Sequence, residues 1–241
     1  MIIVLHRKHL ALPALLLAFM GGMALILWTG QRGTTAFSRE TLTAGRHIVV
    51  VDAGHGGEDG GAVAADGTVE SGLNLEVARR LNDLLAFMGQ RTVMTRTEDV
   101  SIYSPGAETL HQKKVSDLKN RVELVNGTEN AVLLSIHQNS LPSSPKTHGA
   151  QVFYNAVPGG DLLAASVQER LNAAVNAGAG KEPKPIGDSV YLMKHAAVPA
   201  VIVECGFLSN AADTEALKTP AYQTRLALAV AAGYFSTEEL P

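Results

Sequence analysis

The sequence feature that most constrains the fold is the stretch HIVVVDAGHGG, residues 47–57. Its apolar run, IVVV, predicts a short strand that is buried on both faces, as in a parallel sheet. The strand is followed at once by a glycine-rich loop that contains His55. Because open α/β sheets place their functional groups at the carboxyl ends of strands, His55 is a candidate site residue. On this stretch alone, a loop histidine without a role explains the sequence equally well.

Strand and helix patterns alternate along the rest of the chain. Apolar residues at helical spacing over residues 73–85 predict a helix, and Glu70 lies at or just before its start. Residues 91–97 alternate like a strand, so the order strand, helix, strand predicts a βαβ unit. A second apolar strand is predicted over residues 131–140, and it contains another histidine, His137, near its end.

The remaining elements complete a single domain. Further strands are predicted over residues 149–155, 189–193 and 200–205, and further helices over residues 115–126, 161–177 and 222–235, with a short one from about residue 213. Glu204 lies near the end of the last strand. The predicted fold class is α/β, with a twisted, mostly parallel sheet flanked by helices on both faces.

The N-terminal residues have a different composition. Residues 10–29 carry no charge, and twenty apolar residues are long enough to cross a bilayer of about 30 Å as a helix. Basic residues precede this segment, which predicts export of the remainder, and no clear cleavage site follows it. We expect an N-terminal membrane anchor or signal segment at residues 1–30, a tether at 31–45 and an extracytoplasmic catalytic domain at 46–238.

Composition limits the chemistry. The 241 residues are 46% hydrophobic and carry a formal net charge of -3, which does not favour a nucleic-acid partner. The single cysteine, Cys205, excludes an intramolecular disulfide and a multi-thiolate metal site, so a metal would need histidine and carboxylate ligands. The serine-hydrolase motif GxSxG and the zincin motif HExxH are both absent.

Hydrolytic zinc sites use three protein ligands of the His/Glu type and leave a position for water. His55, Glu70 and His137 can supply that set from two strand ends and one helix start. Glu58 is a rival for Glu70, because the spacing of His55 and Glu58 resembles that of zinc carboxypeptidases. Glu204, in a segment where a buried glutamate is costly, is the candidate general acid and base.

Five motifs then appear in an order that resembles one known family: VDAGHGGEDGGA (51–62), VESGLNL (69–75), TRTED (95–99), SIHQNS (135–140) and VECGFLSN (203–210). They are similar to the motifs of the zinc-dependent N-acetylmuramoyl-L-alanine amidases of the amidase 3 family. The resemblance covers the predicted catalytic domain. It implies zinc ligands at His55, Glu70 and His137, with Glu204 as the catalytic glutamate. Ser71, where the family commonly has lysine, and Gln138, often a smaller residue, depart from the pattern.

Within the family, residues 112–126 and 148–155 and the segment ending in VECGFLSN are most similar to the germination-specific amidases of endospore-formers. This resemblance implies removal of stem peptides from spore cortex peptidoglycan between the forespore membranes, before a deacetylase allows muramic-δ-lactam to form. A lipoprotein activator is implied for some relatives. The alternatives are a vegetative amidase for cell separation or autolysis, and a non-catalytic wall-binding or activator protein.

A glycan strand needs an open site. Loops at residues 101–112, 141–147 and 179–188 are expected to wall a groove. Asn139, Arg96 and Lys194 are candidate contacts to substrate, and for each a solvated or purely structural position is an equally good interpretation.

Overall fold

A computed structural model of the chain describes residues 47–176, 178, 180–237 and 240. The predicted anchor at residues 1–30 and the tether at 31–45 lie outside this range. Within it, no helix combines the length and the apolar character needed to cross a membrane.

The described part of the chain forms a six-stranded sheet with the order β2-β1-β3-β6-β4-β5. The strands are β1 (Ile48–Ala53), β2 (Thr92–Met94), β3 (Ala131–Asn139), β4 (Gln151–Tyr154), β5 (Lys184–Pro185) and β6 (Ala200–Phe207). Strands β2, β1, β3 and β6 are parallel, and β4 runs antiparallel to β6. The sheet is therefore mostly parallel, as the βαβ pattern predicts.

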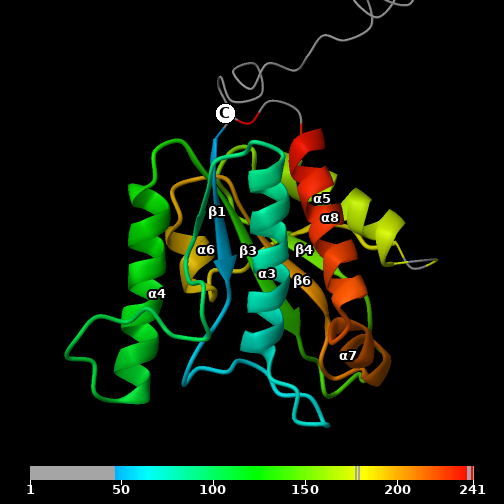
Figure 1. Cartoon of the computed structure of the whole chain (residues 1–241), viewed down its shortest axis with the longest axis horizontal. Coiled ribbons are helices and arrows are strands. Elements are labelled where there is room, and N and C mark those ends of the chain that lie inside the picture. The colour runs from blue at the N-terminus through cyan, green and yellow to red at the C-terminus, as the bar shows by residue number, and fades with distance from the viewer. Residues whose placement is uncertain (1–46, 177, 179, 238–239, 241) are drawn as a thin grey trace, which may run out of the picture. The chain divides into compact units, whose positions relative to one another are not determined.

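Six helices of the described region flank this sheet, and Figure 1 shows their arrangement around it. They are α3 (Glu70–Phe87), α4 (Leu110–Gly127), α5 (Gly160–Ala174), α6 (Tyr191–His195), α7 (Ala211–Leu217) and α8 (Pro220–Ser236), with α3, α5, α7 and α8 on one face and α4 and α6 on the other.

The two faces have separate cores because successive residues of a strand point to opposite sides of the sheet. Val49 and Val51 of β1 pack with apolar residues of α3, α5 and α8. Val50 of β1 and Leu133 of β3 pack with α4 and α6 on the other face. The central strands are thus buried on both sides, which explains their near-continuous apolar sequences.

Local sequence signals account for several helix starts. Helix α4 begins with a capping box, in which Thr109 and Gln112 each bind the other's backbone N–H. The helix therefore starts five residues before the start of the helix predicted over residues 115–126. Asn210 caps α7 through the backbone N–H groups of Ala212 and Asp213, as its position before that helix indicates.

Two expectations about the elements were wrong. Residues 189–193 were expected to form a strand, but Tyr191–His195 is the short helix α6. A short apolar run does not distinguish a strand from a buried helix turn, and Leu192 and Met193 pack against the sheet rather than extend it. The loop expected at 179–188 contains the two-residue strand β5.

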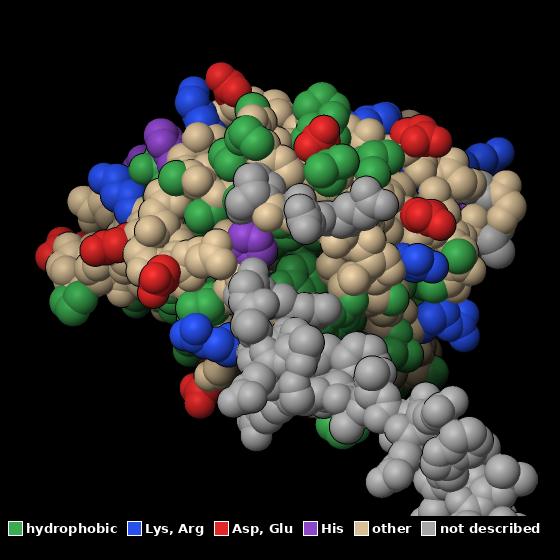
Figure 2. Space-filling model, turned by 90° about the horizontal axis from the view of Figure 1, so that it is seen from above, with side chains coloured by type: hydrophobic (Ala, Val, Ile, Leu, Met, Phe, Trp, Pro, Cys, Tyr) green, Lys and Arg blue, Asp and Glu red, His purple; other side chains and the backbone are tan. Residues whose placement is uncertain are grey.

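Figure 2 shows the end of the sheet at which β1 begins, seen from above relative to the view of Figure 1. Acidic and basic side chains are interspersed among apolar ones on this face. That distribution agrees with the small net charge of the chain. The candidate site residues lie at the opposite end of the sheet, where β1, β3 and β6 finish.

Candidate metal centre and active site

His55 follows β1 in a tightly held loop. Its backbone φ is 60°, a left-handed conformation that is uncommon for residues other than glycine. Arg121 donates hydrogen bonds to the carbonyls of Ala53 (2.8 Å) and His55 (2.7 Å), and Arg96 donates to those of Ala53 (2.8 Å) and Gly54 (3.0 Å). Two buried guanidinium groups therefore hold the backbone that presents His55.

A buried ion pair anchors this support. Nη1 of Arg121 lies 2.5 Å from Oδ1 of Asp52, and Nε lies 2.7 Å from Oδ2 of Asp117. Burial opposes ionisation of Asp52, but the charge of Arg121 and hydrogen bonds from Ser135 and Thr95 hold its pKa below the usual value. Burial lowers the pKa of Arg121, but the carboxylates of Asp52 and Asp117 raise it above the usual value, so the pair remains ionised inside the domain.

His55, Glu70 and His137 converge on one point. Each offers a ligand atom, and these atoms all lie within 4.8 Å of one another. Oε1 of Glu70 lies 3.4 Å from Nε2 of His55 and 3.0 Å from Nδ1 of His137. The two imidazole rings stand edge to face, with centroids 5.1 Å apart. Two imidazoles and one carboxylate form a donor set suited to a divalent metal ion.

Glu70 is the most firmly held member of the three. Its Oε2 accepts a hydrogen bond from the backbone N–H of Ala62 (2.8 Å), and its Oε1 accepts from the backbone N–H of Gln138 (3.1 Å) and from Asn74 (3.2 Å). Burial opposes ionisation, but the adjacent histidines lower the pKa of Glu70 well below its usual value. Glu70 is therefore an anionic, immobilised carboxylate.

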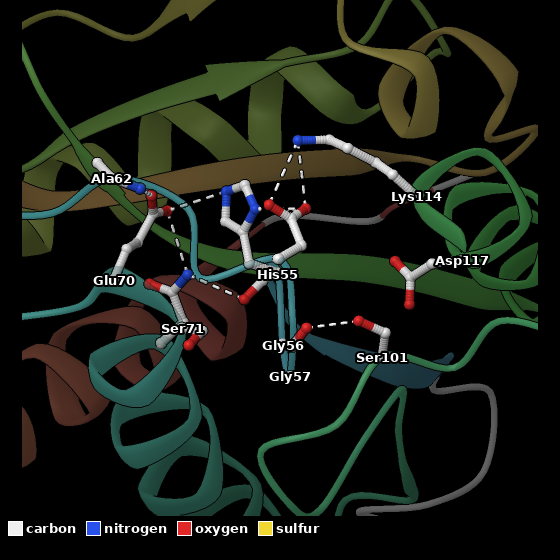
Figure 3. Close-up of polar contacts among 12 residues, drawn as sticks. His55, Gly56, Gly57, Ala62, Glu70, Ser71, Ser101, Lys114 and Asp117 are labelled. Atoms are coloured by element: carbon white, nitrogen blue, oxygen red, sulfur yellow. Dashed lines mark hydrogen bonds and ion pairs between the residues drawn. The ribbon is translucent and has the colours of Figure 1, made fainter. Parts of the chain in front are cut away.

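The other nitrogen of the His55 ring is also engaged. Nδ1 lies 3.0 Å from Oδ2 of Asp59, and that oxygen lies 3.2 Å from Nζ of Lys114 on α4. Figure 3 shows Glu70 on one side of the His55 ring and the Lys114 side chain extending from α4 on the other side. Burial lowers the pKa of His55, but hydrogen bonds and charges of Glu70 and Asp59 outweigh it, so the pKa is raised.

Glu204 lies beside this group. In the parallel pairing of β3 and β6 it is the register partner of His137. Its Oε2 is buried and has no hydrogen-bond partner among the described residues. Burial raises the pKa of Glu204 to about 7. An unpartnered buried carboxyl group with such a pKa is able to exchange protons near neutral pH.

Two glycines leave room for these side chains. A Cβ atom at Gly54 would overlap the ring of His137. At Gly61, where φ is +71°, a Cβ would lie 2.5 Å from Oε2 of Glu70 and 2.7 Å from Cδ2 of His55. The glycines of the loop after β1 are therefore needed for the side chains to approach one another.

The remaining candidates from the sequence lie elsewhere. Glu58 is 58% exposed and pairs with Lys113 at 2.7 Å, outside the three-residue group. Arg96 is 3% exposed and donates to backbone carbonyls, which supports the structural interpretation of this residue over a substrate contact. Lys194 is exposed and lies 3.4 Å from Asp188.

Sequence reasoning missed the residues that support the site. Asp59 lies in the same loop as His55, and a carboxylate close to a metal-binding histidine is a recognisable signal. Arg121 and Asn74 gave no such signal, because each acts on residues distant in sequence. Asn74 links Glu70 to the carbonyl of Gly54, at 3.2 and 3.1 Å.

One cavity is lined in part by the site histidines, and a second lies near the start of α7. The α4–α6 cavity, of about 260 Å³, has both histidines in its wall together with Lys114, Leu118, Tyr191 and Ile202. The second, which we call the α7 cavity, is about 400 Å³ and is lined mainly by apolar residues near the start of α7. Its charged lining residues are Asp66 and Glu215.

Comparison with known proteins agrees with this geometry. The family model described as N-acetylmuramoyl-L-alanine amidase, Amidase_3, matches residues 49–235. The germination-specific N-acetylmuramoyl-L-alanine amidase of Bacillus subtilis (strain 168) is 33% identical over 240 residues, covering 98% of this chain and 99% of that protein.

Solved structures give the same result. The CwlD amidase from Clostridioides difficile, determined in complex with the GerS lipoprotein, has a TM-score of 0.75 at 35% identity and covers 80% of this chain and 100% of that one. An N-acetylmuramoyl-L-alanine amidase from Clostridium difficile 630 has a TM-score of 0.68 at 27% identity, covering 79% and 95%. The chain belongs to the amidase 3 family of N-acetylmuramoyl-L-alanine amidases.

Proposed function

We propose that His55, Glu70 and His137 bind one zinc ion, and that Glu204 is the general acid and base for hydrolysis of the amide between N-acetylmuramic acid and L-alanine. The observation that carries this proposal is the convergence of three donor atoms within 4.8 Å of one another, beside a buried carboxylate oxygen that lacks a partner. The donor types match those of hydrolytic zinc sites.

The side chains around the three ligands also fit a metal ion. Asp59 accepts a hydrogen bond from Nδ1–H of His55, which leaves the Nε2 lone pair directed toward Glu70. Nδ1 of His137 faces the same carboxylate. Bound zinc would supply Lewis-acid activation of water and of the substrate carbonyl.

The protein's own groups then handle the protons. Oε2 of Glu204 takes the proton released as water attacks the carbonyl carbon, and returns it to the alanine nitrogen as the C–N bond breaks. His137 lies beside Glu204 on the neighbouring strand β3. The carboxyl group that carries the proton and the proposed metal ligands therefore keep a fixed relative position. The Arg96 and Arg121 contacts hold the His55 backbone throughout this cycle.

For the biological substrate we propose spore cortex peptidoglycan, with removal of the stem peptide preceding a deacetylase step that leads to muramic-δ-lactam. The near end-to-end match to the germination-specific amidase of Bacillus subtilis supports this. The proposal places the enzyme outside the cytoplasm, between the forespore membranes, with residues 1–30 as its membrane anchor. A lipoprotein activator is part of the proposal, because the CwlD relative was solved with the GerS lipoprotein.

A vegetative wall amidase is the second candidate. The N-acetylmuramoyl-L-alanine amidase LytC of Bacillus subtilis is 30% identical over 78% of this chain, and the match covers 35% of LytC. Deletion of the gene separates the two candidates: loss of muramic-δ-lactam from spores supports the cortex role, whereas unchanged lactam with defective cell separation supports the vegetative role.

The reaction itself is tested by incubating the full chain with cortex peptidoglycan, with zinc and after zinc removal, and analysing the muropeptides by mass spectrometry. We expect peptide-free muramic acid only with zinc. If the enzyme needs an activator, extract from sporulating cells that lack this gene can supply it. The assay is therefore repeated with that extract added. Intact stem peptides in both assays would contradict the proposal.

A further inference from the structure

Lys114 is placed to contact the substrate as well as the site. It is one of the residues lining the α4–α6 cavity, which also contains His55 and His137. Its side chain is 49% exposed and pairs with Asp59. The other cation lining this cavity, Arg121, is buried, and its hydrogen bonds go to Asp52, Asp117 and two backbone carbonyls. Lys114 therefore offers the accessible positive charge of this cavity wall.

The position of Glu204 indicates which half of the substrate enters this cavity. Strand residues two apart point to the same face, so Glu204 shares its face with Ile202, which lines the α4–α6 cavity. Glu204 must reach the alanine nitrogen of the leaving group. The stem peptide that continues from this nitrogen therefore extends along the α4–α6 cavity.

Charge supports the same assignment. The charged residues lining the α7 cavity, Asp66 and Glu215, are carboxylates that both pair with Lys218, a residue outside the cavity lining. In the α4–α6 cavity the carboxylates already have partners: Asp59 binds His55 and Lys114, and Asp117 binds Arg121. The described lining of the α4–α6 cavity includes the exposed cation Lys114, whereas that of the α7 cavity includes no lysine or arginine, so an anionic peptide is better accommodated beside Lys114.

Distance selects the part of the peptide that Lys114 can reach. A single oxygen, Oδ2 of Asp59, contacts both His55, at 3.0 Å, and Nζ of Lys114, at 3.2 Å. The ammonium group therefore lies close to the metal-binding group, as Figure 3 also shows. Successive Cα atoms are about 3.8 Å apart, so a substituent on the second residue of the stem peptide lies within roughly 7 Å of the scissile nitrogen.

We propose that Lys114 is a specificity-determining residue that binds the α-carboxylate of the second residue of the stem peptide. This inference rests on the proposed function, since it takes the direction of the peptide from the role of Glu204. The ammonium group forms a charge-assisted hydrogen bond with the substrate carboxylate while remaining near Asp59.

Two muramoyl dipeptides test this contact: muramoyl-L-alanyl-D-glutamate, which has a free α-carboxylate, and its D-isoglutamine counterpart, in which that group is an amide. We expect the full-length enzyme to prefer the carboxylate by roughly tenfold in kcat/KM, mainly through KM. Lys114→Met should abolish the preference, and Lys114→Arg should restore part of it. Lys113→Met is the matched control, because Lys113 pairs with Glu58 and does not line the cavity.

Equilibrium binding of the product peptides, L-alanyl-D-glutamate and L-alanyl-D-isoglutamine, is measured in parallel by calorimetry. Lys114→Met should lose the tighter binding of the carboxylate form. If Lys114→Met keeps the preference in binding, the inference is wrong, whether or not the enzyme hydrolyses the substrates. Failure of every protein to hydrolyse either muramoyl dipeptide, with the binding preference intact and dependent on Lys114, would contradict the proposed reaction instead.

Discussion

Asp59 and His55 form a direct contact, with Oδ2 of Asp59 3.0 Å from Nδ1 of His55, while Nε2 of the same ring lies 3.4 Å from Glu70. The imidazole is therefore held from both sides. A carboxylate on the far nitrogen fixes the ring orientation and increases the basicity of the nitrogen that binds metal. Asp59 should thus determine how tightly the site binds zinc without being a ligand.

Replacing Asp59 by alanine should lower zinc affinity by roughly 10–100-fold, as measured by competition with a chelating dye. Glu58→Ala is the control, because Glu58 belongs to the same loop but pairs with Lys113. Its zinc affinity should equal that of the wild type. A larger loss for Glu58→Ala than for Asp59→Ala would mean that Glu58 is the ligand.

Gly61 tests the close packing of the ligand group. An added methyl group would lie 2.5 Å from Oε2 of Glu70, so Gly61→Ala should displace that carboxylate and weaken zinc binding at least tenfold. Gly67→Ala is a matched control, since φ is +86° there and no atom lies near the added methyl group. Both changes should cost about 1–2 kcal/mol in unfolding free energy from backbone strain. Equal zinc affinity in the two variants would refute the packing argument.

The buried pair of Asp52 and Arg121 should make the protein sensitive to acid. The pKa of Asp52 is lower in the folded state, so its stabilising contribution is present above its unfolded pKa of about 3.9 and is lost as pH falls through the folded value. Asp52→Asn should lower the unfolding free energy by about 3–5 kcal/mol at pH 7 and reduce its decline below pH 4.

Urea unfolding followed at several pH values measures both effects. Asp188→Asn serves as the control, because this side chain is 90% exposed and pairs only with the exposed Lys194 in the described structure. That variant should follow the wild type. An Asp52→Asn protein as stable as the wild type at pH 7 would show that the ion pair contributes nothing.

Glu204→Gln should separate proton transfer from metal binding. The amide cannot accept the proton of water, so kcat should fall by a factor on the order of 10²–10⁴. The zinc content should stay at one ion per chain, because Glu204 is outside the ligand group. The control is Glu169→Gln, an exposed glutamate on α5. Near-normal turnover by Glu204→Gln would exclude it as the acid and base.

The sequence predicted the parts of the fold and site that depend on local pattern. Short apolar strands that end in polar residues located His55, His137 and Glu204 at one edge of the sheet, because parallel strands share that edge. The helical spacing after Glu70 indicated its place at a helix start, and α3 begins at that residue. These inferences need only the periodicity of each segment.

Other features depend on contacts between distant residues. Arg121 supports His55 from 66 positions away, and nothing in its helix distinguishes it from a surface arginine. Helix α6 was mistaken for a strand because Leu192 and Met193 are buried in either form. Burial of Arg96 likewise follows from the three-dimensional packing, which its loop sequence does not reveal.

Anomalous X-ray diffraction at the zinc edge, from crystals of the full chain grown with zinc, locates the metal ion directly. We expect one strong peak at about 2.0–2.2 Å from Nε2 of His55, Nδ1 of His137 and a carboxylate oxygen of Glu70. A zinc peak bound by other residues, or none near these three in zinc-saturated protein, would contradict it.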